Sequence, residues 1–325
     1  MKNTLERIQK KKAEFDAFKP FPKTFMANME EWYKIELTYT SNAIEGNTLT
    51  RQETALVVEK GITVEGKSIV EHLEAINHAK AYEYIKKLQF NNLKKINQSI
   101  ILNIHSLILQ NIDPQNAGRY RTTPVRIAGS TVIMPNPLKV PDLMKQFIVW
   151  LHNSKKTPAE IAVEAHFKLV SIHPFADGNG RTARLLMNLI LLTNGYPPTV
   201  ISNQNRKQYI ESIEKGQLKD DLSDYDDFMF RAVEKSFDSF FETVNAKDKK
   251  RPVAKIFLKI GELAKETNET VATIRFWTKE GLLKVAKRSS GGYQLYSLQT
   301  IDRVKKIRKL QKERRLTLAE LRRIV

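Results

Sequence analysis

Residues 173–184, which read HPFADGNGRTAR, bring several chemically active groups close together. They include an imidazole at His173, a carboxylate at Asp177 and guanidiniums at Arg181 and Arg184. Glycines directly before a helix let backbone N–H groups face an anion, and the helix N-terminus adds partial positive charge. The two arginines share a helix face and supply fork-shaped donors. The stretch therefore predicts a polyphosphate site, with His173 as candidate general base and Asp177 as candidate metal ligand.

The same stretch fills every defined position of the signature HPFx[D/E]GNGRxxR, and it thereby resembles the Fic family. Fic proteins typically transfer AMP from ATP to a protein hydroxyl. The resemblance implies that His173 deprotonates a Ser, Thr or Tyr of a target protein and that Asp177 holds Mg²⁺. It also implies a set of nucleotide-binding residues: Asp177, Gly178, Asn179, Gly180, Arg181, Thr182, Ala183, Arg184 and Tyr209. The alternative is an ordinary helix start with an incidental histidine.

Residues 118–137, GRYRTTPVRIAGSTVIMPNP, alternate in polarity and are rich in Val, Ile and Thr. With Gly129 and Ser130 as turn residues, the pattern predicts a β-hairpin on a helical body. The segment resembles the Fic flap, which implies that it aligns the target by main-chain pairing. The flap residues would be Val125, Arg126, Ile127 and Ala128. An ordinary surface hairpin is the alternative.

Residues 41–47, SNAIEGN, resemble the [S/T]xxxE[G/N] inhibitory motif of the Fic class with an N-terminal inhibitory helix. Ser41 and Glu45 lie one helical turn apart, and Gly46 can end the helix. The Glu45 carboxylate could pair with Arg184 and so occupy the guanidinium that would hold the γ-phosphate. A weaker alternative is that Glu45 positions a water that removes AMP, and another is a solvated glutamate at a helix end.

The segments around these motifs read as helices, so the predicted fold class is mainly α. Apolar residues recur at three-to-four spacing, and Thr50 with Glu53 forms a capping-box signature. The predicted helices cover residues 25–44, 69–88, 100–112, 143–151 and 161–170. Together with the flap they correspond to the Fic helical fold with a β-hairpin.

Residues 61–68, GITVEGKS, match the phosphate loop G-x-x-x-x-G-K-[S/T]. That loop needs a buried strand before it and a second strand that ends in an aspartate. The capping box at Thr50 instead predicts a helix before it, and Glu65 would place a carboxylate among the phosphates. We therefore interpret the match as a coincidence.

The chain has 325 residues, no cysteine and a formal net charge of +18. Residues 247–325 hold 22 Lys and Arg against 8 Asp and Glu, which gives +14, and residues 1–246 carry the remaining +4. A basic end region on a nearly neutral body predicts contact with nucleic acid or another polyanion. No apolar run is long enough for a membrane helix, and the charged start lacks a secretory signal. The expected location is cytoplasmic.

The basic region resembles the winged helix-turn-helix of MerR-type proteins. Residues 260–283 match the two helices and their turn, with Thr270 as a helix cap, and residues 290–296 match the wing. The resemblance implies DNA contact through Arg275, Lys279, Lys287, Arg288 and Tyr293. Two departures weaken it: Ala272 stands where a basic residue is common, and the long dimerising helix is not expected. Docking of a protein target is the alternative use.

These observations predict four segments: an N-terminal helical region over 1–90, a Fic core over 91–244, a linker over 245–252 and a winged helix-turn-helix over 253–325. The predicted function is an autoinhibited protein adenylyltransferase, which uses ATP and Mg²⁺ and has itself as one possible target. One alternative is a DNA-binding regulator with a nucleotide-responsive or self-modifying Fic body. Another is a Fic transferase with UTP, GTP or CDP-choline as donor, because the signature binds phosphates rather than bases. Ile210 also replaces a tyrosine that is common beside Tyr209, so the preference for adenine stays open. His166 is expected on a packed helix face rather than in a metal pair. Many Fic proteins are dimers, so a homodimer is one alternative for the oligomeric state of this chain.

Overall fold

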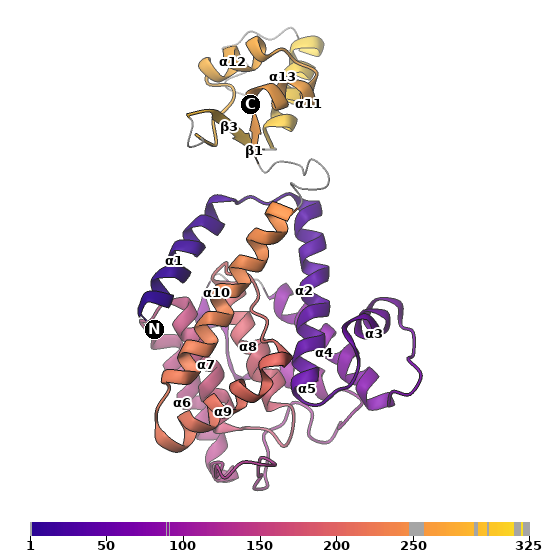
Figure 1. Cartoon of the computed structure of the whole chain (residues 1–325), viewed down its shortest axis with the longest axis vertical. Coiled ribbons are helices and arrows are strands. Elements are labelled where there is room, and N and C mark those ends of the chain that lie inside the picture. Colours follow the sequence, from indigo (N-terminus) through magenta and orange to yellow (C-terminus); the bar gives the residue numbers. More distant parts are fainter. Residues whose placement is uncertain are drawn as a thin grey trace. The chain divides into compact units, whose positions relative to one another are not determined.

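The computed structural model describes residues 2–88, 90, 92–246, 257–288, 292–297, 299–314 and 320. The chain divides into two compact units, which are described separately: Met1–Ala17 with Ala27–Phe241, and Phe18–Met26 with Glu242–Val325 (Figure 1). Residues 90 and 91, the predicted boundary, both belong to the first unit. Most of the predicted linker, from residue 247 to 252, lies outside the described residues. Among the described helices, none is both long and apolar enough to cross a membrane.

The first unit is built of helices, which confirms the predicted fold class. It holds all or most of each of these α-helices: α1 (Lys2–Ala17), α2 (Lys23–Ile44), α3 (Arg51–Ala55), α4 (Ile69–Lys87), α5 (Gln98–Leu109), α6 (Val140–Asn153), α7 (Pro158–Ile172), α8 (Asn179–Thr193), α9 (Arg206–Lys219) and α10 (Ser223–Ala246). A π-helical turn, η1 (Leu56–Lys60), continues α3. Short 3₁₀ turns are η2 (Leu93–Lys95), η3 (Pro137–Lys139) and η4 (Asn203–Asn205).

Helix α8 forms the centre of the first unit. It packs against α7, α5 and α4, and Figure 1 places it between α7 on one side and α4 and α5 on the other. Nearly all of its residues are buried, as expected for a helix that is covered on every face. The start of α8 is the second half of the 173–184 motif, so the packed core fixes the direction in which this helix N-terminus points.

Helix α2 carries the predicted inhibitory motif and lies along α4. Ion pairs join Lys34 to Glu83 and Lys86 to Glu30. Nearer the motif, the Thr38 hydroxyl is 3.1 Å from a ring nitrogen of the buried His78. These contacts hold the last turn of α2 beside the start of α8.

Local capping signals explain where several helices begin. The predicted capping box of Thr50 and Glu53 is confirmed at α3, and a second one at Ser68 and Glu71 opens α4. Gly61 ends η1 with a left-handed conformation, φ 63°. The phosphate-loop match is therefore preceded by helix rather than by a buried strand, which confirms the interpretation as a coincidence.

The described residues of the second unit form a three-stranded antiparallel sheet and three helices from β1 onward. The elements are β1 (Phe257–Lys259), α11 (Ile260–Thr267), α12 (Val271–Lys279), β2 (Lys287–Arg288), β3 (Gln294–Ser297) and α13 (Gln299–Arg314), and the strand order is β1-β3-β2. Leu258 pairs with Tyr296, and Lys287 pairs with Leu295. As predicted, the Thr270 hydroxyl caps α12 by accepting from the Thr273 N–H. The helix-turn-helix and its β2–β3 wing are thus present.

Candidate active site

A tight turn between α7 and α8 folds the 173–184 motif into one site. The Asn179 side chain closes this turn, because its amide accepts from the Phe175 N–H and donates to the Phe175 carbonyl, both at 2.9 Å. The ring of His105, on α5, stacks on Phe175, and its Nε2 lies 2.9 Å from the Asp177 carbonyl. Asn179 therefore shapes the loop with its side chain, and only its backbone is available to an anion.

His173 stands at the C-terminal end of α7 in a left-handed conformation, φ 49°. For a residue other than glycine this conformation carries strain, which is common at functional sites. Its Nδ1 lies 3.3 Å from the Val170 carbonyl, which can only accept, so Nδ1 carries the proton and Nε2 is the basic nitrogen. Burial lowers the pKa of His173, and the nearby Arg121 acts in the same direction. The ring is therefore neutral and half-buried beside the start of α8.

The first turn of α8 has the features of an anion cradle. Gly178 is its N-cap, with φ 74°, and no described side chain caps the helix. The amides of the first turn thus lack intrahelical partners. The side chain of Arg181 is buried, and its Nε has no hydrogen-bond partner among the described residues. A Cβ added to Gly180 would overlap the Glu45 carboxylate, so that carboxylate lies directly over the glycine turn.

Arg184 contacts the segment that carries the predicted inhibitory motif. Its Nη2 donates to Glu45 Oε1 at 2.5 Å and to the Ser41 carbonyl at 2.9 Å, and its Nε donates to the Ser41 hydroxyl at 2.9 Å. Burial alone would raise the pKa of the Glu45 carboxyl, but Arg184, with Arg181 and Arg206, lowers it below its ordinary value. Glu45 is therefore ionised, and its charge is matched by the buried Arg184 guanidinium.

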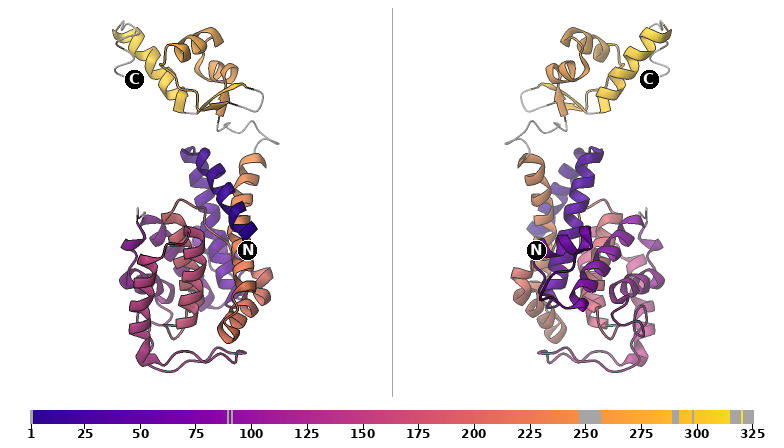
Figure 2. Two further views of the ribbon diagram at one scale, coloured as in Figure 1. Left: turned by 90° about the vertical axis from the view of Figure 1, so that its left-hand side faces the viewer. Right: turned by 90° about the vertical axis from the view of Figure 1, so that its right-hand side faces the viewer.

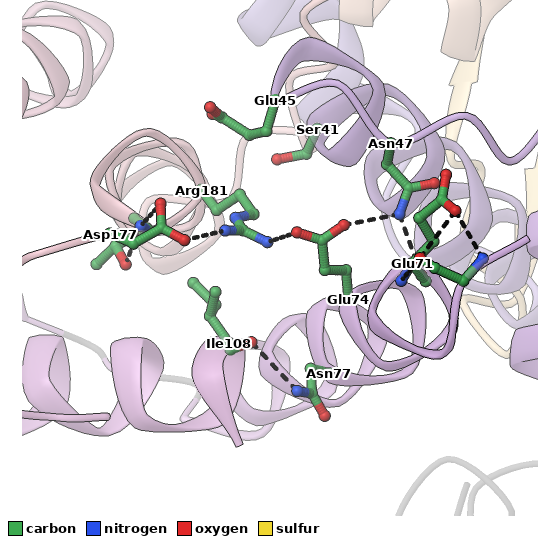
Figure 3. Close-up of polar contacts among 12 residues, drawn as sticks. Ser41, Glu45, Asn47, Glu71, Glu74, Asn77, Ile108, Asp177 and Arg181 are labelled. Carbon is green, nitrogen blue, oxygen red and sulfur yellow. Dashed lines mark hydrogen bonds and ion pairs between the residues drawn. The ribbon is translucent and has the colours of Figure 1, made fainter. Parts of the chain in front are cut away.

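A second carboxylate, Glu74 on α4, binds Arg181, and no motif in the sequence pointed to this residue. Arg181 Nη1 donates to Glu74 at 2.7 Å and Nη2 to Asp177 at 3.2 Å (Figure 3). The other oxygen of Glu74 accepts from Asn47 at 2.8 Å. Figure 3 shows Glu45 and Ser41 facing the same region. Both motif arginines are thus paired with carboxylates from N-terminal helices.

Asp177 presents the exposed carboxylate of the site, with a side chain that is 70% exposed. One of its oxygens accepts from the Gly178 N–H at 2.6 Å. Oxygen donors of this kind suit Mg²⁺, which binds through one or two carboxylates together with phosphate oxygens. In the described part of the chain no three His, Asp or Glu side chains form a ready metal site. The donor set therefore fits an ion that is shared with a bound polyphosphate.

Three residues that were predicted to bind the nucleotide have side chains that are buried away from the site in this structure. Thr182 and Ala183 are buried in the core because they lie on the faces of α8 that pack against other helices, and the Thr182 hydroxyl donates to the Gly178 carbonyl. Tyr209 was predicted to line the nucleoside pocket, but it is 1% exposed and faces the buried side of α9. Its hydroxyl lies 3.4 Å from Arg184 Nη1. The neighbouring Ile210 is exposed instead.

The predicted flap, residues 118–137, turns at Gly129, where the Ser130 N–H donates to the Ile127 carbonyl at 3.1 Å. Within this fully described segment the arms extend without forming strands, so the predicted strand pairing is absent here. The hairpin of this structure is β2–β3 in the second unit. Figure 2 shows the loop crossing one end of the first unit. The tip is held by Glu214 on α9, which accepts from the Ser130 hydroxyl.

The four predicted flap residues lie on the arm that leads to this turn, with Val125 and Ile127 half-buried and Arg126 and Ala128 exposed. The buried Arg121 anchors the base of the segment. Its guanidinium donates to the carbonyls of His173, Thr123 and Pro135. These bonds take the place of a strand ladder and tie the flap to the catalytic turn.

The predicted DNA-contact residues are partly within the described structure. Arg275 and Lys279 are exposed on α12, and Tyr293 is exposed with the Lys259 ammonium 5.4 Å from its ring centre. The side chains of Lys287 and Arg288 lie outside the described residues, as do residues 289–291 of the wing. Two basic side chains of α13 serve the fold instead: Arg308 pairs with Glu269, and Arg303 donates to the Leu282 carbonyl.

Comparison with known proteins matches each of the two units to a different family. Residues 95–191 match the model of the Fic/DOC family, and residues 258–325 match that of MerR HTH family regulatory proteins. The solved structure of Fic-1 (residues 134–508) from Caenorhabditis elegans is similar, with a TM-score of 0.68 and 32% identity, over 75% of this chain and 73% of that one. This chain belongs to the Fic family.

Two further relatives define how far the likeness extends. Protein adenylyltransferase Fic of Nematostella vectensis is 40% identical over 205 residues, which are 62% of this chain and 47% of that protein. The chain thus spans about half the length of the curated relatives it matches. A Fic family protein from Desulfovibrio desulfuricans has the same fold, with a TM-score of 0.64 at 22% identity, over 91% of this chain.

Proposed function

We propose that this Fic protein is an autoinhibited protein adenylyltransferase that transfers AMP from ATP to a Ser, Thr or Tyr hydroxyl. The observation that carries the proposal is that a neutral, half-buried His173 lies beside a helix N-terminus without a side-chain cap and beside the two motif arginines. Relatives named protein adenylyltransferase support it. No other described part of the molecule combines a base with an anion cradle in this way.

In the proposed reaction the target hydroxyl oxygen attacks the α-phosphorus of ATP, and its proton passes to His173 Nε2. The bond between the α-phosphorus and the bridging oxygen breaks, so pyrophosphate leaves. The amides at the start of α8 and the guanidiniums of Arg181 and Arg184 stabilise the charge on the phosphates. Mg²⁺, held by Asp177 and phosphate oxygens, would neutralise further charge. The flap would align the target backbone so that its hydroxyl meets the α-phosphate.

The proposed inhibition is a competition for Arg184. With Glu45 on this guanidinium and over Gly180, the outer phosphates cannot take their productive places. A misplacement of the reacting phosphate by about 1 Å costs on the order of a hundredfold in rate.

The test is to replace Glu45 with glycine. We expect Glu45→Gly to incorporate AMP from labelled ATP about a hundredfold faster than the wild type, because Arg184 is released. The double variant Glu45→Gly, His173→Ala is the control and should be inactive. Equal labelling by Glu45→Gly and the wild type would rule out inhibition by Glu45. No labelling by either protein would rule out AMP transfer.

The donor and a second role are separate proposals. Mass spectrometry of Glu45→Gly incubated with ATP, UTP, GTP and CDP-choline would identify the added group, which matters because the exposed Ile210 replaces a common tyrosine. The exposed Arg275 and Lys279 of α12 favour DNA binding by the second unit. Modification of the protein itself that changed its DNA affinity would favour a regulator over a plain transferase.

A further inference from the structure

Behind Arg184 lies a line of buried polar groups that the reaction, as proposed, does not use. Tyr209 on α9, His166 on α7 and Tyr225 on α10 are all essentially inaccessible to solvent. The Tyr209 hydroxyl lies 3.4 Å from Arg184 Nη1 and 2.8 Å from His166 Nε2. The other ring nitrogen of His166, Nδ1, lies 2.7 Å from the Tyr225 hydroxyl, which in turn is 2.9 Å from the Val163 carbonyl.

The hydrogen-bond partners determine where each proton in this line lies. The Val163 carbonyl can only accept, so the single proton of the Tyr225 hydroxyl is directed to it. The Tyr225 oxygen must then accept from His166, which places a proton on Nδ1. Nε2 is consequently an acceptor, so the Tyr209 hydroxyl donates to it and turns a lone pair toward Arg184 Nη1.

The opposite order of protons is unfavourable at two positions. If Tyr225 donated to His166, Nε2 would carry the ring proton and would donate to the Tyr209 oxygen. Arg184 Nη1 donates to the same oxygen, so the proton of the buried Tyr209 hydroxyl would have no acceptor. The Val163 carbonyl would also face an oxygen with no proton between them. An unsatisfied buried polar group costs about 1–3 kcal/mol, which favours the first order.

We propose that His166 and Tyr225 are positioning residues that act through Tyr209 to hold the Arg184 guanidinium in place when Glu45 is withdrawn. The other partners of Arg184 are Ser41, on the last turn of α2, and Glu45, directly after this helix, and they would leave together. Tyr209 contacts a different guanidinium nitrogen and belongs to α9, so it stays. Its fixed lone pair keeps Arg184 oriented, with the remaining N–H groups directed to an outer phosphate. This inference rests on the proposed function.

The proton order can be measured without any activity. In wild-type protein labelled with ¹⁵N at histidine, long-range ¹H–¹⁵N correlations distinguish the two tautomers, and the spectrum of His166→Gln assigns the signal. We expect a neutral His166 ring protonated at Nδ1 throughout the neutral range, in agreement with a pKa that burial and the charge of Arg184 lower to about 3. A ring protonated at Nε2, or at both nitrogens, would overturn the proposal.

The positioning role is tested by ATP affinity in the Glu45→Gly background. Tyr209→Phe and His166→Leu should each raise the Kd for ATP about tenfold, the effect of losing one hydrogen bond to a charged group. His166→Gln, which retains a donor and an acceptor, should recover part of the affinity. His152→Leu, on α6 and bonded only to the Ile96 carbonyl, is the matched control.

An unchanged Kd in folded Tyr209→Phe and His166→Leu variants would overturn the positioning role. Circular dichroism and melting temperature establish that each variant is folded, and should His166→Leu not fold, Tyr209→Phe decides alone. These outcomes are distinct from failure of the proposed function, which would be absence of AMP transfer by Glu45→Gly while the ATP affinities still follow the predicted order.

Discussion

At the scale of single residues, His173 links the strain of the backbone to the chemistry of the site. Its left-handed backbone conformation ends α7 and directs the chain into the turn that becomes the anion cradle. The Val170 carbonyl fixes the proton on Nδ1, and burial keeps the ring neutral. A base must be unprotonated to accept a proton, so a lowered pKa favours catalysis at neutral pH.

The pKa of His173 leads to a prediction for the pH dependence. A base is inactivated as pH falls through its pKa, so lowering the pKa moves the acid limb of the profile to lower pH. We expect the rate of AMP transfer by Glu45→Gly to reach half its plateau below pH 6.5, the ordinary pKa of histidine. Single-turnover rates at saturating ATP measure it. A half-maximum above pH 6.5 would contradict a buried, neutral base.

Residue types and spacing predicted Arg184 and its partner Glu45, because the motif and the inhibitory segment each carry their own local signal. The partners of Arg181 and Tyr209 were not predictable in this way. Glu74 is 107 residues from Arg181, and His166 is 43 residues from Tyr209, so only the packing of α4, α7 and α9 brings them together. A tyrosine near a nucleotide motif does not reveal which face of its helix is buried.

At the scale of elements, the position of Glu45 depends on how the end of α2 is attached to α4. Asn47 makes this attachment: its side-chain amide donates to the Glu71 carbonyl at 3.1 Å and to Glu74 at 2.8 Å (Figure 3). Its side-chain oxygen accepts from the Leu49 N–H. The Asn47 side chain therefore joins the loop after α2 to α4, and Glu74 of α4 in turn binds Arg181.

This attachment predicts that Asn47→Ala weakens the proposed inhibition by Glu45. Loss of a partly buried hydrogen bond costs about 1 kcal/mol, or about fivefold in an equilibrium. We expect Asn47→Ala to raise AMP incorporation about fivefold over the wild type, measured with labelled ATP. In the Glu45→Gly background the same change should have no further effect, and Asn153→Ala, which removes a similar bond at the end of α6, should leave the rate unchanged. Additive activation would contradict the role of Asn47.

The elements themselves were largely predictable because their signals are local. Helical periodicity and the box at Thr50 and Glu53 involve neighbours within a turn or two. The conformation of the flap was not predictable in this way. Alternation of polarity shows only that one side of an extended chain is buried, and it does not show whether the two arms pair as strands. The tip of the flap bonds to Glu214, and its two arms are joined by the Arg121 side chain, which donates to the Pro135 carbonyl, rather than by a backbone ladder.

At the scale of the whole molecule, charge is distributed unevenly along the chain. The part up to residue 246 is close to neutral at +4, and the remainder carries +14. In the first unit, Arg181 and Arg184 of the candidate site are buried and paired with carboxylates. In the second unit Arg275 and Lys279 are exposed on α12. This distribution is typical of a domain that meets a polyanion.

We therefore expect the full chain to bind duplex DNA in a salt-dependent manner. Affinity that comes from phosphate contacts falls by orders of magnitude between about 50 and 200 mM salt, and each lost contact lowers the slope of log Kd against log salt by about 1. Fluorescence anisotropy with labelled duplex should give such a slope, lower by about 1 in Arg275→Ala and again in Lys279→Ala. Arg126→Ala, an exposed arginine of the flap, is the matched control and should not change it. Binding that is insensitive to salt would contradict phosphate contacts, because such contacts release counterions, and no binding at all would rule out the DNA role and leave docking of a protein target as the remaining use of α12.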